Sequence, residues 1–462
     1  MNPAAITKLN LQNIKKLLNA GCASPSDNNC SFTCCISYFY LIYLSFRTVV
    51  NMTKIEIIDA AFKVWGRNFY RKTSLSQLAG QLKVSKPALY RHFENKQALN
   101  IAMTKNFFDD FSAAIRSDFE QALQANDADE GIYTIIHSIA DYFSRNVYAL
   151  IFSLMNIYTR NLDGLLMTEN LKSRGVDMQI LQLVLEKKYN ANMAVVQMIF
   201  ATLTFFMSNF HMTGKSMDKT PADDEILAVI NLIYKTIKNG IGFSAEKANL
   251  DYEKLEKQVE EITLNTEPEP FFKAVAEAVA AAGPWKVSME MVAKRLGLSK
   301  SSLYGHFKNR KDMLRRLFAG EFRRIIEFAR RGIGLSGDTA EQLYLGIFSI
   351  AVYLRSRPEI LTAMGWIRLR KLNLGKPEKN TEIFRLFEDL DIELMRNISE
   401  EEKQRVSHWI LILLINVLIQ PDKNNKLSWL AEENVIPQIN AQNADIRVLY
   451  KFLTLGLGGF IK

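Results

Sequence analysis

Two stretches of this sequence bring similar polar side chains together at the same spacing. They are SKPALYRHFENKQAL at residues 85–99 and SKSSLYGHFKNRKDM at residues 299–313. Hydroxyl groups, histidine rings and cationic side chains can hydrogen-bond to phosphate oxygens and to the edges of bases. An enzyme is not indicated, because there is no P-loop or GxSxG pattern and two of the five histidines, His92 and His306, lie in these stretches. We therefore expect a nucleic-acid-binding protein with no catalytic residue, metal or cofactor.

The residues around the first stretch predict the helices that hold it. Apolar residues at spacings of three and four mark one face of a preceding helix, formed by Ile55, Ile58, Phe62 and Trp65. Ser74 and Gln77 match a capping box at the start of a second helix, and Ser85 can cap a third. Asn95 can cap a fourth helix that begins at Lys96. Two short helices joined by a tight turn make a helix-turn-helix, whose second helix lies in the major groove of DNA.

The motif and its surroundings occur twice. An offset of 214 residues aligns the two stretches without a gap, and IYKTIKNGIGF from residue 233 is echoed by LYKFLTLGLGGF from residue 449. Two whole units are therefore repeated, which fits a chain of 462 residues at roughly 100 to 200 residues per domain. After each motif the periodicity is helical and no strand pattern occurs.

The repeated pattern resembles a known family. LAxxLxVSxxxLYxHFxNK, at residues 78–96 and with changes at residues 292–310, is similar to the DNA-binding domain of the tetracycline-repressor-like (TetR) transcriptional regulators. The resemblance implies an all-α fold of two tandem units, each a three-helix helix-turn-helix head on a larger helical body. It also implies that each body binds a small molecule and dimerises through its last two long helices. Ordinary members have one head per chain, whereas this chain carries two.

We divide the chain where its composition and pattern change. The expected segments are a leader at 1–51, a first head at 52–103, a first body at 104–243, a linker at 244–269, a second head at 270–317 and a second body at 318–462. The linker has a narrow apolar seam at Tyr252, Leu255, Val259 and Ile262, and a helix of about twenty residues, roughly 30 Å long, is predicted there. Pro268 and Pro270 are expected to stop it.

The leader requires its own interpretation. Residues 28–46 carry no charge over about the length of a membrane span, which could indicate an anchor. A disordered leader or an untranslated upstream segment is favoured instead, because a new helical pattern opens at Met52. All four cysteines lie in the leader, so the remaining chain fits a reducing compartment and has no zinc pattern. We expect a cytoplasmic bacterial protein.

The expected DNA contacts follow from matched positions in the two heads. They are Ser74, Ser85, Lys86, Ala88, Tyr90, Arg91, His92 and Lys96 in the first head, and Ser288, Ser299, Lys300, Ser302, Tyr304, His306 and Arg310 in the second. The resemblance assigns the two tyrosines to the DNA backbone, and Lys96 and Arg310 lie beside helix amides that can hold a phosphate. Alternatively, the tyrosines brace the motif, the histidines pack locally and the cations face solvent.

The two heads differ at positions that could read bases. Arg91 can bind guanine through two hydrogen bonds, but its counterpart is Gly305, so the heads cannot read identical half-sites through that position. The turn glycine of the family is Gly297 in the second head and Lys83 in the first, where a left-handed backbone costs a lysine on the order of 1 kcal/mol. The net charge of +9 and the dense cations of the second head favour a polyanionic partner.

Two apolar segments close each body, at 193–212 with 226–237 and at 406–419 with 446–457. They predict core helices or a four-helix bundle between the two halves, and we favour the intramolecular pairing. Aromatic and methionine side chains of the bodies could line a pocket for a mostly apolar effector. The candidate effector-binding residues are Phe111, His137, Phe152, Asn156, Phe348, Met364 and Trp366.

These features predict a transcriptional regulator, in most cases a repressor, that binds double-stranded DNA as a single-chain pseudo-dimer with unequal half-sites. Binding of a small molecule would release it from DNA. Further homo-oligomerisation is an open possibility. The alternative is that one head is vestigial, so that the chain either homodimerises through the other head or sequesters another protein.

Overall fold

The computed structural model describes residues 53–67, 74–154, 165–213, 220–262, 270–361, 382–396, 398–419 and 441–462. Within these ranges the secondary structure is helical, apart from one isolated antiparallel bridge between Tyr189 and Ile461. The predicted all-α fold is confirmed. The leader at 1–51, with its uncharged stretch and its four cysteines, lies outside the described residues.

The first head consists of three helices, α3 (Lys54–Arg67), α4 (Leu75–Gln81) and α5 (Lys86–His92). Ser74 and Gln77 form the predicted capping box, since the Gln77 amide donates to the Ser74 hydroxyl at 3.2 Å and the Ser74 amide donates to Gln77 Oε1 at 2.7 Å. The predicted apolar face of α3 is wrong at Ile55, which lies in the first turn and is 65% exposed. Ile58 and Trp65 are buried as predicted, and the buried face also includes Ile57, Ala61 and Val64.

The second head repeats this arrangement with α14 (Pro270–Lys286), α15 (Met289–Leu296) and α16 (Lys300–His306). The linker before it is helical only in α13 (Tyr252–Glu260), among the residues that the structure describes, so the prediction of about twenty helical residues is wrong. Asp251 caps α13 through the Lys254 amide, which fixes its start. Pro270 begins α14 rather than ending the linker helix, because proline is tolerated in a first turn.

The first body surrounds the long helix that leaves the first head. Its helices are α6 (Lys96–Gln124), α7 (Ala128–Arg145), α8 (Val147–Phe152), α9 (Leu165–Lys172), α10 (Gln179–Glu186), α11 (Met193–Thr213) and α12 (Asp223–Asn239). Helices α6 and α7 pack against each other, and α10, α11 and α12 all pack on α7. Buried phenylalanines of α6 form the inner side of this layer, at Phe107, Phe108, Phe111 and Phe119.

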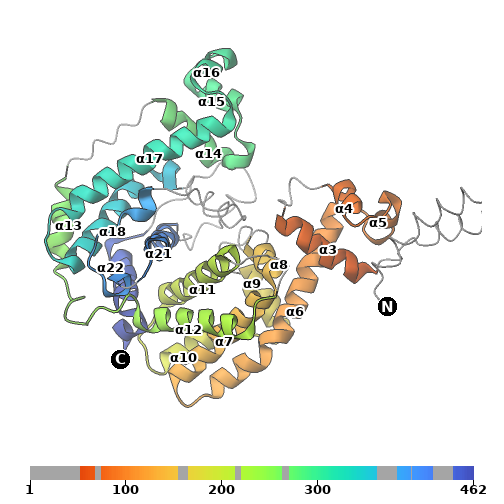
Figure 1. Ribbon diagram of the computed structural model, residues 1–462, viewed down its shortest axis with the longest axis horizontal. Coiled ribbons are helices and arrows are strands. Elements are labelled where there is room, and N and C mark those ends of the chain that lie inside the picture. The colour runs from red at the N-terminus through yellow and green to blue at the C-terminus, as the bar shows by residue number, and fades with distance from the viewer. Residues whose placement is uncertain are drawn as a thin grey trace, which may run out of the picture.

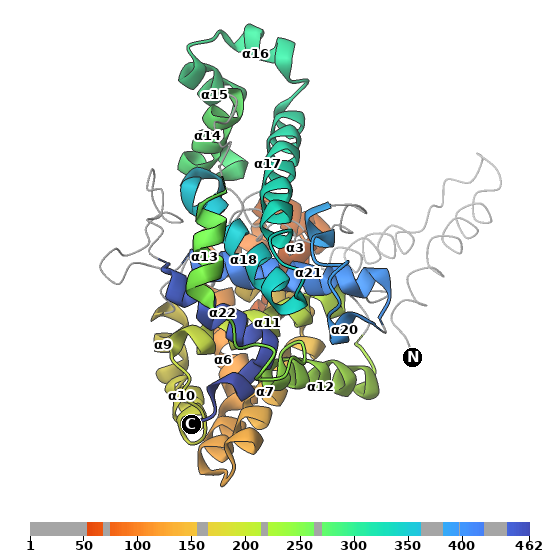
Figure 2. The same cartoon turned by 90° about the vertical axis from the view of Figure 1, so that its left-hand side faces the viewer.

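The second body begins with α17 (Arg310–Ile333), which runs from the second head into the body (Figure 2). It continues with α18 (Thr339–Ser356), helical residues at 358–361, η3 (Glu382–Arg385), α20 (Glu393–Arg396), α21 (Glu400–Leu418), α22 (Asn443–Leu455) and η5 (Gly456–Phe460). Helices α17 and α18 pack closely, as α6 and α7 do in the first body.

The closing helices of the two bodies pack against each other. Helix α11 contacts α21 and α22, and α12 contacts α22 and η5 (Figure 1). At the centre, Trp409 Nε1 donates to Thr202 Oγ1 at 3.1 Å, and both side chains are buried. His408 meets the Phe205 ring edge to face at 5.2 Å. The two halves of the chain therefore share one apolar interior.

A backbone crossing joins the ends of the two halves. Gly240 and Gly456 follow α12 and α22 with φ of 59° and 57°, and each lies against the backbone at the end of the other half's last helix. The Ile241 amide donates to the Leu453 carbonyl at 2.8 Å, and the Phe243 amide donates to the Thr454 carbonyl at 3.1 Å. A Cβ at either glycine would collide with this backbone, so the approach requires glycine on both sides.

One helix among the described residues, Met193–His211 within α11, is long and apolar enough to cross a membrane. It packs against α7, α12, α21 and α22, and half of its most apolar window is buried inside the molecule. These contacts make it a core helix of the interface between the halves.

Candidate nucleic-acid interface

The second helix of the first helix-turn-helix, α5, carries a polar outer face. Ser85 caps α5 by accepting a hydrogen bond from the Ala88 amide at 3.2 Å. Leu89 and Phe93 are buried and hold the helix on the head. The outer face then exposes Lys86, Tyr90, Arg91 and His92, with Tyr90 at 42% exposure. These are hydrogen-bond donors of the kind that contact phosphates and base edges.

Helix α16 presents the corresponding face of the second head. Ser299 caps it through the Ser302 amide at 3.1 Å, while Leu303 and Phe307 are buried. Lys300, Ser302, Tyr304 and His306 are exposed, with Tyr304 at 48%. The two heads thus present their predicted residues in the same register, and both helices can approach a major groove.

Three of the residues predicted to contact DNA are partly committed to the fold, either by burial or by a capping hydrogen bond. Ala88 is only 9% exposed, whereas its counterpart Ser302 lies on the surface. The Ser74 and Ser288 hydroxyls both accept capping hydrogen bonds at 3.2 Å from Gln77 and Met291. Each hydroxyl keeps its proton and one lone pair for further contacts.

The two histidines lie in different surroundings. The His306 ring lies 4.5 Å from the Phe271 ring, in agreement with local packing against α14. His92 is exposed at the end of α5. The position that matches Phe271 in the first head is Ile57, which has no ring to pack on His92.

Lys96 and Arg310 begin the helices that leave the heads. Asn95 caps α6 through the Ala98 amide at 2.8 Å, and Lys96 Nζ lies 5.9 Å from the centre of the Trp65 ring. Burial lowers the pKa of the Lys96 ammonium. Arg310 is exposed and its Nη1 lies 3.5 Å from the Val287 carbonyl. Both cations lie beside a helix N-terminus, where phosphate binding is favourable.

The turns of the two motifs share one backbone conformation. Lys83 has φ of 55° and Gly297 has φ of 67°, and Lys83 is the one non-glycine residue with positive φ in the described ranges. The predicted left-handed position is therefore present in both heads, occupied by a lysine in one and by glycine in the other.

The cations after the second head are partly neutralised. Arg315 Nη2 lies 2.8 Å from Asp312 Oδ1, and Arg316 Nη2 lies 3.3 Å from Asp312 Oδ2. The positive surface nearest the motif therefore comes mainly from other exposed residues, Lys294, Arg295, Lys300, Lys308 and Lys311. Glu290, which replaces Ser76 of the first head, is exposed among them.

The geometry of both heads defines a helix-turn-helix DNA-binding domain: two short capped helices, a tight left-handed turn and a polar outer face. The family model described as bacterial regulatory proteins, tetR family, matches residues 57–103 and 272–317. Both heads are therefore tetR-family DNA-binding segments, and this chain carries that segment twice in tandem.

A solved structure is also similar to this chain. It is the crystal structure of the TetR family transcriptional regulator PfmR from Thermus thermophilus, with 22% sequence identity and a TM-score of 0.30. The match covers 39% of this chain and 97% of that one. The two matched segments make this protein a DNA-binding transcriptional regulator.

The candidate effector residues that the structure describes lie in both bodies. Phe111, Phe152 and Phe348 are buried in the two body cores, and His137 is half-buried with its ring 5.9 Å from that of Tyr133. Asn156, Met364 and Trp366 lie outside the described residues. The three phenylalanines pack as core.

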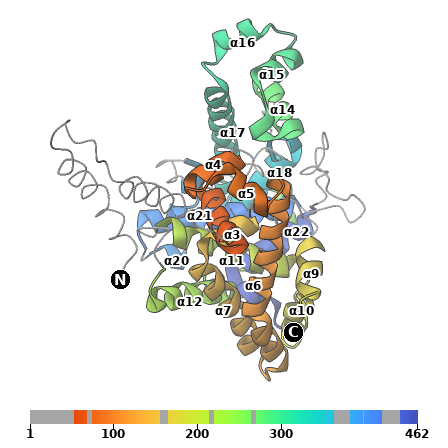
Figure 3. The ribbon, with the colours of Figure 1, turned by 90° about the vertical axis from the view of Figure 1, so that its right-hand side faces the viewer.

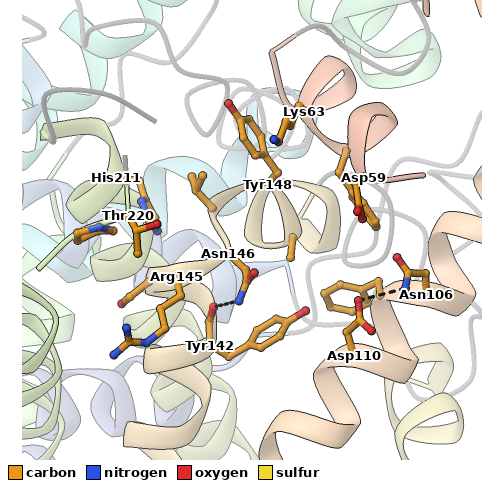
Figure 4. A pocket seen from close by; sticks show the side chains of 16 residues that line it. Asp59, Lys63, Asn106, Asp110, Tyr142, Arg145, Asn146, Tyr148, His211 and Thr220 are labelled. Atoms are coloured by element: carbon orange, nitrogen blue, oxygen red, sulfur yellow. Dashed lines mark hydrogen bonds between the residues drawn. The ribbon is translucent and has the colours of Figure 1, made fainter. Parts of the chain in front are cut away.

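A cavity of about 490 Å³ lies where the first head meets the first body, and its lining includes none of the predicted effector residues that the structure describes. Its walls come from α3, α6, α7, α8 and the end of α11, with Thr220 and Pro221 at its edge (Figure 4). The lining is largely polar, in contrast to the predicted apolar pocket. Sequence reasoning missed Asp59 and Asp110 here, because single acids on amphipathic helices have the pattern of solvent-facing positions.

Proposed function

We propose that this protein is a cytoplasmic repressor that binds its operator as a single-chain pseudo-dimer, with one head on each of two unequal half-sites. The observation that carries the proposal is the packing of α11 and α12 of the first half on α21 and α22 of the second. These are the helices through which family members are expected to dimerise. One chain then contains the pair of heads that otherwise requires two chains.

Differences between the exposed faces of α5 and α16 support unequal half-sites. Arg91 projects from α5, whereas Gly305 at the same position has no side chain. An arginine that binds guanine through two hydrogen bonds contributes about 1–3 kcal/mol of discrimination at one base pair. The heads also project from different parts of the molecule, so the spacing of the half-sites depends on how the bodies are held (Figure 1 and Figure 3).

The test is selection of binding sites from randomised duplexes by the full chain, combined with the mass of the complex. We expect two unequal half-sites at one fixed spacing and one chain of 52.8 kDa per duplex. A perfect palindrome bound by two chains would contradict the pseudo-dimer and favour homodimeric binding through one kind of head. No enrichment would favour the protein-interaction role.

A reciprocal pair of substitutions tests which head binds which half-site. In Arg91→Gly, one base pair of one half-site should lose its preference, while Gly305→Arg should add a preference for guanine in the other half-site. Each variant is the control for the other, since both change one exposed position on the outer face of its helix. Changes in both half-sites from either single variant would contradict the assignment.

A further inference from the structure

The cavity between the first head and its body brings two carboxylates from different elements to the same wall. Asp59 belongs to α3 of the head and Asp110 to α6, and Asn106 lies beside them (Figure 4). Asp110 accepts one hydrogen bond, from Asn106 Nδ2 at 3.1 Å. Within the described ranges, Asp59 has no hydrogen bond or ion pair and the buried Asn106 Oδ1 has no donor. This wall therefore offers several acceptor oxygens and few donors.

The electrostatics agree with an unsatisfied negative wall. Burial raises the pKa of Asp59, and the charge of Glu56 adds to it while Lys63 opposes it. Burial also raises the pKa of Asp110, together with the charges of Asp59 and Asp109. Both side chains are exposed where they line the open cavity, and a cation between them would be attracted by two like charges at once.

The basic side chains that line the cavity form no ion pair with Asp59 or Asp110 in the described structure. Arg145 is engaged by Asp141 at 3.0 Å and Asp223 at 2.8 Å, and it lies on the opposite side of the cavity (Figure 4). A ring nitrogen of His211 lies 2.8 Å from the Phe143 carbonyl, and burial lowers the pKa of this histidine, which favours the neutral ring. Lys63 follows Asp59 by one turn of α3 and is exposed. It forms no ion pair with Asp59 in the described structure.

The second half has the opposite charges at the equivalent positions. The offset of the repeated motif places Lys273 at the position of Asp59 and Arg324 at the position of Asp110. Aligning the caps Asp127 and Asp338 of α7 and α18 places Arg357 at the position of Asn146. Both acids of the first half are thus replaced by cations.

The second half uses two of these cations internally. Glu321 is 1% exposed and accepts a hydrogen bond from Tyr353 at 2.7 Å. Arg324 Nη1 and Arg357 Nη2 lie 3.3 Å and 3.5 Å from its Oε1. Guanidinium groups of the chain itself therefore satisfy the buried carboxylate here, whereas the first half leaves its carboxylates open to the cavity.

We propose that the cavity of the first half binds a small organic cation, a primary amine or an amidinium with an apolar ring, whose charge lies between Asp59 and Asp110. The rings of Phe62, Phe107 and Tyr142 line the same cavity and suit the apolar part. No cation should bind at the equivalent place in the second half, because the guanidinium groups of Arg324 and Arg357 already lie there.

Binding here would act directly on the head. Asp59 and Phe62 belong to the head helix α3, which also packs on α8 through the Phe62 and Phe152 rings at 4.9 Å. Asp110 and Tyr142 belong to the body. A cation that joins them fixes the orientation of the first head relative to its body, and this regulatory step rests on the proposed function as a DNA-binding pseudo-dimer.

The probes are 2-phenylethylamine and benzamidine, with 2-phenylethanol as the neutral match, and calorimetry on the full chain without DNA measures binding. We expect both cations to bind in one copy per chain and the alcohol to bind at least about tenfold more weakly. Asp59→Asn and Asp110→Asn should each weaken cation binding by about tenfold or more, and Glu120→Gln, on the solvent face of α6, should leave it unchanged. Circular dichroism confirms that the variants are folded.

Equal affinity for the amine and the alcohol, wild-type affinity in both aspartate variants, two copies per chain, or no binding of either cation would each overturn the proposal. DNA affinity is measured separately, on the selected operator with and without 2-phenylethylamine. Cation binding that leaves the DNA affinity unchanged would refute the regulatory step and keep the cation site. A chain that binds no operator but does bind the amine would refute the proposed function alone.

Discussion

The turn of the first helix-turn-helix holds a lysine in a left-handed backbone conformation. Lys83 has φ of 55°, and Gly297 occupies the same position of the second head at 67°. A side chain in this region costs roughly 1 kcal/mol relative to glycine. We predict that Lys83→Gly slows hydrogen exchange of the α4 and α5 amides by about fivefold, because the local opening energy rises by about 1 kcal/mol. In the matched variant Gly297→Ala, exchange of the α15 and α16 amides should become faster, and unchanged rates in both heads would contradict this account.

Asp129 holds together residues from three parts of the first body. It accepts hydrogen bonds from Lys188 Nζ at 2.7 Å and from the Tyr189 hydroxyl, and Lys238 Nζ lies 3.0 Å away. Burial would raise the pKa of Asp129, but the hydrogen bonds from these three residues outweigh it and lower the pKa to about 2. Because the folded pKa is depressed, the carboxylate stabilises the fold above about pH 4, and this stabilisation is lost as the pH falls toward 2.

We predict that Asp129→Asn lowers the stability by about 2 kcal/mol at pH 7, the energy equivalent of the pKa shift. The melting temperature of the variant should therefore lie several degrees below that of the wild type at pH 7, and the difference should shrink as the pH falls below about 4. Glu120→Gln on the exposed side of α6 is the control and should melt as the wild type does. A deficit that stays constant with pH would show that the ionised form of Asp129 is not the cause.

At the residue scale, the features that the sequence predicted are those set by residues within a few positions of one another. The Ser74 and Gln77 capping box and the left-handed turn at Lys83 belong to this class, since each is decided by local backbone geometry. Ile55 was assigned to the buried face and is exposed, because a three-four spacing cannot show where a helix meets its neighbours. Asp59 and Asp110 were missed for the same reason, because their meeting depends on two helices far apart in the sequence.

At the element scale, the linker helix α13 is fixed to the second body by one buried carboxylate. Glu256 accepts hydrogen bonds from Arg447 Nε and Nη2 at 2.8 Å each, from Asn443 Nδ2 at 2.9 Å and from the Tyr344 hydroxyl at 2.5 Å. Burial would raise the pKa of Glu256, but the hydrogen bonds from Arg447, Tyr344 and Asn443 lower it overall. The seam predicted at Leu255 and Val259 is buried as expected, whereas no pattern in the linker indicated that an acid between them would be buried too.

We predict that Glu256→Ala detaches α13, because a half-buried arginine and a buried tyrosine hydroxyl lose their acceptor. Hydrogen exchange of residues 252–260 should become at least about a hundredfold faster, in line with the roughly 3 kcal/mol or more that breaking a buried ion pair costs. Glu253→Gln, on the exposed side of the same helix, is the matched control. Protection of α13 that is equal in the two variants would show that the apolar seam alone holds the linker.

At the scale of the whole molecule, the two halves are repeats in sequence but have diverged in what their equivalent positions do. The repeat, the two heads and the helical bodies follow from patterns that recur along the chain, and these could be predicted. The contrast between open carboxylates at Asp59 and Asp110 and the closed cluster around Glu321 could not, because it requires knowing which helices face each other. Divergence of this kind is available to a tandem chain because the two halves are encoded separately, whereas the subunits of a homodimer must change together.

The crossing of Gly240 and Gly456 tests whether the two halves act as one unit. A Cβ on Gly456 would lie 2.5 Å from the Ile237 carbonyl oxygen, and its φ is 57°. We predict that Gly456→Ala separates the ends of α12 and α22 and weakens the packing of the halves. Binding to the operator with two half-sites should then fall by about tenfold or more, while each head keeps its own half-site preference.

Gly242→Ala is the matched control, because Gly242 also has a positive φ, of 86°, but open space around its Cβ position. Anisotropy titrations on the full operator and on single half-sites measure both effects. Equal losses in the two variants would trace the effect to backbone strain alone, and an unchanged operator affinity in Gly456→Ala would show that the heads bind DNA without depending on how the halves are joined.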